Sequence, residues 1–397
     1  MSPVRIVQPT EPGLRSVPAP PCVAVQRYPE RYRDKLLVDT LHDGDAFPAR
    51  LLANPRVKAA WDDGSLEEAF ELHRDWGADL VAGHLAAALG LPGHHKVVPA
   101  RVVMDFNRFP GASPPDADPL ERRALGEPLA ELLTHDDKRH VLEDHYDAVS
   151  RGMDAAITGR LIKLAIHTYD EHNDSRTRRP EVSLLTRSDS YQRDSRLPYG
   201  LFDPLFPHIL VESCAKPIVR DRIALTLERA GFAVEHNYPY NLPDGSVEIR
   251  CQPWLFFQHL RDRYEAERPQ SRSDAGYAQV WEMLLNTNLR GGDALSAYLH
   301  RFRLPSGDVA PFERAREAYE ALSRWVCERP ELVEAYRRSH DRTSTITIEV
   351  RKDLVWRFVD GRPVGPREDV AREVAYTIAQ AVATYLREDR EFQTRAR

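Results

Sequence analysis

One apolar run constrains the fold of this chain more than any other stretch. Residues 161–166, Leu-Ile-Lys-Leu-Ala-Ile, are followed at once by His167 and then by a polar segment. A short, largely apolar run of this kind is typical of a strand that is buried on both faces of a parallel sheet. In open α/β sheets, ligands bind beyond the carboxyl ends of the strands. We therefore expect His167 to lie at a functional site, although a lone histidine there would more often only cap a strand.

The composition excludes several classes of protein. Of the 397 residues, 42% are hydrophobic, and the formal net charge is -6. This charge gives no general attraction to nucleic acid or to an anionic membrane, and no apolar run is long enough to cross a bilayer. The N-terminus lacks the apolar core of a secretory signal. Four cysteines are scattered without a paired spacing, as expected of reduced thiols in a cytoplasmic protein.

The pattern of apolar runs predicts one α/β domain with two additions. Residues 1–34 are rich in proline and predict an extended arm along the surface. Residues 35–397 alternate strand-like and helix-like stretches, which predicts a three-layer α/β fold with a mixed sheet and helices on both faces. From about 252 to 342 the helical stretches dominate, as in a helical insertion. Strands are predicted at 35–40, 97–104, 161–166, 181–186, 209–212, 232–236 and 343–350.

Polar side chains gather at the predicted carboxyl ends of four strands: His42, Asp105, Asn107, Arg108, His167, Glu349, Arg351 and Asp353. A parallel sheet brings such ends to one edge, so these groups can converge. Two histidines and a carboxylate, with a fourth position open, form the usual ligand set of a hydrolytic zinc site. A further glutamate would transfer the proton of the attacking water, and an arginine with an asparagine would bind a substrate carboxylate.

Seven short motifs follow one another along the chain: HDGDAFP at 42–48, RDWGAD at 74–79, DFNR at 105–108, IHTYD at 166–170, RPEV at 179–182, NYPY at 237–240 and IEVRKDL at 348–354. Their succession resembles that of the N-formylglutamate amidohydrolase family. The resemblance runs in islands from about residue 35 to residue 390 and leaves 252–342 largely uncovered. The DFNR and IEVRKDL segments are its most specific parts.

The resemblance implies a carboxypeptidase-like zinc fold with one ion per chain, which hydrolyses an N-acyl amide of an acidic amino acid. It implies His42, Asp75 and His167 as metal ligands and Glu349 as the general base. The positions that it implies for substrate binding are Asn107, Arg108, Arg179 and Asn237. The expected partner is a small N-acyl amino acid, of the N-formyl type, or a short peptide, and neither nucleic acid nor a membrane.

Departures from the family pattern leave several alternatives open. Asp45 lies three residues after His42, and a His-x-x-acid spacing can itself bind a metal, so Asp45 competes with Asp75 as the acidic ligand. The glycine-rich segment of the family pattern is replaced here by residues 241–250, in which Arg250 is a candidate to supply the charge that the segment usually offers. His145 has no assigned role. A metallopeptidase or a peptide-tailoring amidase on the same fold, and a binding protein without catalysis, are the alternatives to the amidohydrolase. Substrate, acyl group and oligomeric state stay open.

Overall fold

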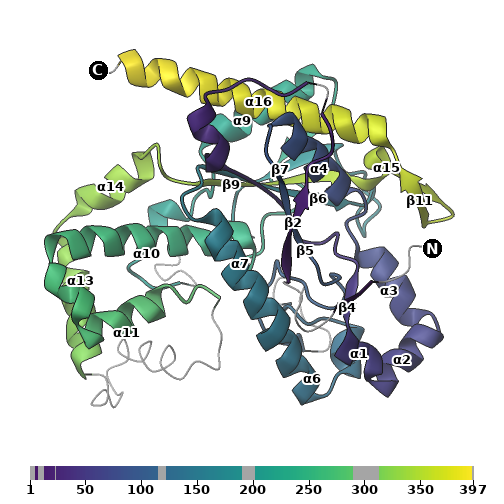
Figure 1. The fold of residues 1–397 in the computed structure, drawn as a ribbon, viewed down its shortest axis with the longest axis horizontal. Helices are drawn as coiled ribbons and strands as arrows, with labels where there is room; N and C mark the ends of the chain where they lie inside the picture. The colour runs from purple at the N-terminus through teal and green to yellow at the C-terminus, as the bar shows by residue number, and fades with distance from the viewer. Residues whose placement is uncertain are drawn as a thin grey trace.

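The central element of the molecule is a seven-stranded sheet (Figure 1). The structure is a computed structural model, and it describes residues 5–7, 13–22, 24–114, 122–189, 202–288 and 313–395. The strands are β1 Arg5–Val7, β2 Leu14–Pro18, β3 Leu36–Thr40, β4 Ala46–Pro48, β5 Gly93–Val97, β6 Ile162–Tyr169, β7 Val182–Leu185, β8 Val234–His236, β9 Ser344–Arg351, β10 Trp356–Val359 and β11 Arg362–Pro366. The order in the sheet is β2-β5-β3-β6-β9-β7-β8.

Helices cover the sheet and form a subregion beside it. They are α1 Ala49–Ala53, α2 Pro55–Asp62, α3 Ser65–His73, α4 Ala78–Ala88, α5 Leu129–Leu132, α6 His135–His140, α7 Asp147–Ile157, α9 Pro217–Arg229, α10 Val247–Glu267, α11 Ala275–Leu284, α13 Glu313–Cys327, α14 Pro330–Arg338, α15 Lys352–Val355 and α16 Glu368–Arg395. A π-helical turn, Val141–Tyr146, joins α6 to α7. Short 3-10 turns lie at Glu30–Lys35, His208–Leu210 and Pro269–Ser273.

The four central strands of the sheet are parallel. β5, β3, β6 and β9 run in one direction, whereas β2, β7 and β8 run against them. The parallel strands β6 and β9 are buried along their whole length, as expected where helices cover both faces. The predicted fold class is confirmed: the protein has a mixed α/β fold whose mostly parallel central sheet is flanked by helices.

Alternating side chains of the strands pack into two apolar layers, one on each face of the sheet. Leu164 and Ile166 of β6 pack with Ile348 of β9 under α4, α9 and α16, which lie together above the sheet in Figure 1. Successive side chains of a strand point to opposite faces, so Lys163 and His167 project to the other side. A second apolar cluster lies on that side and includes side chains of β3 and α7.

A helical subregion follows the first turn of α10. Side chains of α10, α11, α13 and α14 pack into an apolar cluster of their own, centred on the buried rings of Phe256, Tyr264, Trp281 and Trp325. Figure 1 shows these helices together on one side of the sheet. They occupy the segment where the sequence predicted a helical insertion, although α10 already starts at Val247. Residues 289–312 of that segment lie outside the described residues.

Three sequence predictions require correction. The strand predicted at 97–104 is wrong: β5 ends at Val97, and after Pro99 the chain turns, with Val103 N–H donating to the Ala100 carbonyl at 2.9 Å. No strand forms at 209–212, where a 3-10 turn replaces it. β6 runs on to Tyr169, so His167 lies within the strand rather than after it. Hydrophobicity alone could not place these ends, because polar residues also fill interior strand positions here.

The N-terminal segment contributes to the sheet. Leu14–Pro18 forms β2, an edge strand that pairs with β5 in the antiparallel direction. Its proline stands at the strand's last position, where the absent N–H costs no ladder hydrogen bond. Residues 1–4, 8–12 and 23 of the predicted arm lie outside the described residues. Within the described ranges, no helix is long and apolar enough to span a membrane.

Candidate metal centre

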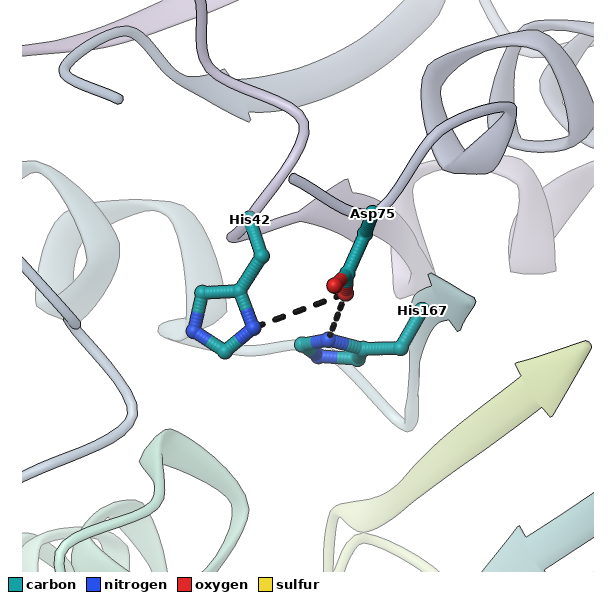
Figure 2. Close-up of side chains that lie close together, drawn as sticks. All are labelled: His42, Asp75 and His167. Carbon is teal, nitrogen blue, oxygen red and sulfur yellow. Dashed lines mark hydrogen bonds and ion pairs between the residues drawn. The ribbon is translucent and has the colours of Figure 1, made fainter. Parts of the chain in front are cut away.

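Three buried side chains from distant parts of the sequence meet at one edge of the sheet. His42 follows β3, Asp75 lies in the break between α3 and α4, and His167 comes from β6. The Asp75 carboxylate oxygen Oδ2 lies 2.9 Å from His167 Nδ1 and 3.5 Å from His42 Nδ1. Figure 2 shows both imidazoles directed at this carboxylate. The rings themselves are in edge contact, with centroids 4.8 Å apart.

The geometry of these groups fits a metal ion. One ligand atom from each of His42, Asp75 and His167 lies within 4.8 Å of the other two, and each residue is at most 3% exposed. Two imidazoles and a carboxylate are a preferred donor set for zinc. His167 Nε2 is buried and has no hydrogen-bond partner among the described residues, whereas Nδ1 of the same ring faces Asp75. Asp45 is not part of the cluster.

Electrostatics hold Asp75 in its charged form. Burial by itself raises the pKa of this carboxyl group, but hydrogen bonds with His167 and His42 bring it well below its usual value. Burial lowers the pKa of His167, yet Asp75 and Glu349 outweigh this effect and raise it to about 9. The site therefore concentrates negative charge around the imidazoles. A cation at this point would be stabilised by the same field.

Local hydrogen bonds fix the segment that carries Asp75. Its N–H donates to the His42 carbonyl at 3.1 Å. Asp43 accepts from Arg74 Nε at 2.6 Å and from the Asp79 N–H at 2.9 Å, so it caps the first turn of α4. Gly77 ends the break with φ +90°, and an added Cβ would lie 2.7 Å from a Val355 methyl carbon. Only glycine suits this position.

Asp105 orients one of the imidazoles. Its Oδ1 lies 2.8 Å from His42 Nε2, leaving Nδ1 of the same ring directed at Asp75. A carboxylate on the second ring nitrogen is the usual support of a metal-binding histidine. Arg101 joins the two acids: its Nη1 lies 3.2 Å from Asp75 and its Nη2 3.3 Å from Asp105. This arginine holds both carboxylates at a fixed separation.

Glu349 stands beside the centre because of strand register. It is the direct partner of His167 in the parallel β6–β9 pair. Its Oε1 accepts from the Tyr240 hydroxyl at 2.5 Å, while Oε2 is buried and has no hydrogen-bond partner among the described residues. Burial raises the pKa of this carboxyl group, and the negative charge of Asp75 adds to the effect, against the opposing charge of His167. A buried carboxylate whose pKa is raised is suited to accept a proton from a neighbouring group.

The centre opens into a cavity of about 460 Å³. Of the residues predicted to bind substrate, Asn107, Arg108 and Arg179 line this cavity. Arg108 Nη1 is buried without a partner among the described residues, and Arg108 Nε lies 4.0 Å from Asp105. Asn237 does not line it: its Oδ1 accepts from the Thr186 and Arg187 N–H groups.

Comparison with known proteins adds a likeness of fold. No family model and no curated protein match the chain. A crystal structure of N-formylglutamate amidohydrolase from Ralstonia eutropha JMP134 is 14% identical, with a TM-score of 0.45 over 96% of this chain and 100% of that one. A gene product of Agrobacterium tumefaciens is 14% identical, with a TM-score of 0.41 over 88% of this chain and 91% of that one. Neither likeness assigns an activity to this chain.

Two residues of the site were missed in the sequence. The sequence places Arg101 inside the strand predicted at 97–104. In the structure this segment is a turn, and the Arg101 side chain contacts both Asp75 and Asp105. Tyr240 stands in the NYPY motif, of which only Asn237 was singled out. Asn237 adopts φ +51° and its side chain holds the chain that presents Tyr240. The NYPY motif thus marks the site correctly, but the sequence does not show that Asn237 supports the backbone while Tyr240 contacts Glu349.

The two residues left unassigned lie away from the metal cluster. Arg250 is buried, with its Nη2 donating to the Phe106 carbonyl at 2.8 Å and its guanidinium over the Phe106 and Tyr146 rings. It therefore ties α10 to the loop that carries the DFNR motif. His145 is buried in the π-helical turn, where burial lowers its pKa.

A buried ion triad lies behind the centre. Lys163 Nζ contacts Asp39 Oδ2 at 2.8 Å and Glu248 Oε1 at 2.6 Å, and all three side chains are fully buried. Lys163 precedes His167 by four residues on the same face of β6. The negative charge of Glu248 also contributes to the raised pKa of His167. The triad thereby ties β3, β6 and α10 together directly under the site.

Proposed function

We propose that this protein is a zinc-dependent amidohydrolase that cleaves an N-acyl amide of an acidic amino acid. The observation that carries the proposal is the buried cluster of His42, Asp75 and His167 with the carboxylate of Glu349 beside it. This arrangement combines the donor set of a hydrolytic zinc site with a separate proton acceptor. A bound zinc ion would act as a Lewis acid, which would polarise the amide carbonyl and make water more acidic.

The chain's own residues would hold the reactants and move the proton. Asp105 keeps His42 in the orientation that directs Nδ1 to the centre. Glu349 takes the proton of the attacking water at Oε2, because its Oε1 is already occupied by the Tyr240 hydroxyl. The same carboxyl group then returns the proton to the departing amine nitrogen. Tyr240 thus fixes the rotamer of the base during both transfers.

The cavity wall supports an acidic substrate. Arg108 offers a guanidinium with a buried, unpartnered Nη1 among the described residues, and a guanidinium matches a carboxylate with two parallel hydrogen bonds. Arg179 also lines the cavity, with its guanidinium carbon 5.2 Å from the centroid of the Tyr169 ring. We assign the substrate carboxylate to Arg108 and leave Arg179 to the rim. Asn107 holds the start of α10 through its side-chain oxygen, which accepts from the Val247 N–H at 3.1 Å.

Metal analysis and a substrate panel test this function together. We expect about one zinc ion per chain in the wild type, loss of that zinc in His167→Ala, and its retention in the matched surface control His172→Ala. Hydrolysis of N-formyl and N-acetyl glutamate should exceed that of N-acyl leucine and should stop with chelator. A chain that binds no zinc, or a His167→Ala variant with full zinc content, would contradict the assignment.

A further inference from the structure

A second cavity adjoins the one at the candidate metal centre, here called the catalytic cavity, and differs from it in being lined by four arginines. Its volume is about 370 Å³, and it shares His73, Arg101, Asp105 and Arg108 with the catalytic cavity as a common wall. The remaining lining comes from the segments on either side of residues 115–121, chiefly Ser113 to Pro114 and Arg122 to Glu127. The four shared residues lie between the two cavities, so a substrate that occupied both would have to pass along Arg108.

Positive charge dominates the lining of this second cavity. Four arginines contribute to it: Arg101, Arg108, Arg122 and Arg123. Among the described residues of the lining, the two carboxylates are Asp105, which is engaged by His42 and Arg101, and the exposed Glu127. The described part of the lining thus carries more cationic than anionic groups.

Arg122 and Arg123 are the cations available to a ligand. Both are exposed, and neither guanidinium forms an ion pair with any residue that the structure describes. The Arg123 guanidinium carbon lies 5.9 Å from the centroid of the Phe109 ring. Burial lowers the pKa of Arg108, with Asp105 opposing and the charges of Arg101 and Arg122 adding to the lowering. Arg108 and Arg122 line the same cavity, so one ligand there would meet both guanidinium groups.

A neighbouring groove on another side of the catalytic cavity would repel an anion. A groove of about 910 Å³ shares Leu72, Asp170 and Lys352 with the catalytic cavity. Its lining is mainly acidic: Asp63, Glu67, Glu68, Glu71, Glu171, Asp353 and Asp360. A negatively charged end of a substrate is consequently directed toward Arg122 and Arg123 and away from this groove.

We propose that the cavity formed by Arg122, Arg123 and Arg108 is a second anion subsite, and that the substrate carries a further anionic group one residue beyond the hydrolysed N-acyl amino acid. The inference rests on the proposed amidohydrolase function and makes its substrate an N-acylated acidic peptide rather than a single amino acid. A carboxylate and a phosphate share the chemistry that the arginines recognise.

Binding of three amidated peptides tests the subsite without turnover. The probes are N-formyl-Glu-Glu amide, N-formyl-Glu-Gln amide and N-formyl-Glu-phosphoserine amide, titrated by calorimetry into zinc-supplemented Glu349→Gln protein. We expect the Glu peptide to bind about five- to tenfold more tightly than its neutral Gln isostere. The preference should disappear in Arg122→Ala/Arg123→Ala and persist in the exposed control Arg56→Ala/Lys58→Ala. A stronger preference for phosphoserine would identify phosphate as the natural group.

The outcomes separate this inference from the proposed function. Equal affinity for the Glu and Gln peptides, no binding of either, or a preference that survives in Arg122→Ala/Arg123→Ala overturns the subsite. A preference that depends on the two arginines, in a protein without zinc or hydrolysis, keeps the subsite and rejects the amidohydrolase. Higher salt should weaken the preference, because partly exposed charges are screened.

Discussion

Replacing Lys163 by methionine should destabilise the protein strongly. The ammonium group is fully buried between Asp39 and Glu248, at 2.8 and 2.6 Å. Methionine fills a similar volume, but it leaves two carboxylates in the interior without a cation. Removing one member of a buried ion pair typically costs about 3–5 kcal/mol, because the remaining charge is uncompensated. We expect a loss of this size for Lys163→Met.

Thermal unfolding monitored by circular dichroism measures this loss. An unfolding entropy of about 2.1 cal/mol/K per residue gives about 0.8 kcal/mol/K for a chain of 397 residues. The expected destabilisation therefore lowers Tm by about 4–6 °C. The matched control is Lys58→Met, which removes an exposed lysine and should leave Tm nearly unchanged.

The pH dependence of the same variant checks the cause. Burial already raises the pKa of Asp39 against the opposing charge of Lys163. Without the ammonium group, the buried carboxyls bind protons more tightly in the folded than in the unfolded state, so the deficit should shrink as pH falls from 8 to 5. The triple variant Asp39→Asn/Lys163→Met/Glu248→Gln should recover much of the stability. A deficit that is absent, or independent of pH and not rescued, would refute the reasoning.

Three further changes test the site and its surroundings. Glu349→Gln should lower kcat about 10²–10⁴-fold while zinc content stays unchanged; in the wild type, kcat/KM should fall on acidification at a pH above the ordinary range of glutamate, because burial raises the pKa of this base. Asp105→Asn should weaken zinc binding about 10–100-fold, measured by chelator competition, since His42 loses its orienting carboxylate. Asp154→Asn should stabilise the protein at pH 8 by about 1–2 kcal/mol in urea unfolding, and little at pH 4. The reason is that burial, opposed by Arg250, raises the pKa of Asp154 to about 6. The folded state therefore favours the protonated form of Asp154 and loses stability as the pH rises through 6. Retained kcat in Glu349→Gln, unchanged zinc affinity in Asp105→Asn, or equal effects of Asp154→Asn at both pH values would contradict the respective assignments.

The choice between Asp45 and Asp75 illustrates a limit of sequence reasoning. Asp45 lies three residues after the predicted ligand His42 in the sequence. Asp75 is the acidic ligand that the family resemblance implies. The structure places Asp75 between the two imidazoles because its N–H bonds the His42 carbonyl and Asp43 anchors the following helix. Spacing along the chain does not encode which of two loops folds over the strand end.

The sequence by itself determined the α/β class, the fully buried parallel strands β6 and β9 and the two histidines of the candidate centre. It could do so because a continuous apolar run, and the polar residues next to it, are local properties of the chain. Tertiary structure decided the rest: the register that sets Glu349 beside His167, and the turn that delivers Arg101 to two carboxylates. It also placed Lys163 against acids 124 and 85 residues away in the chain. These relations depend on strand pairing and helix packing, and the free energies that select them are summed over the whole fold.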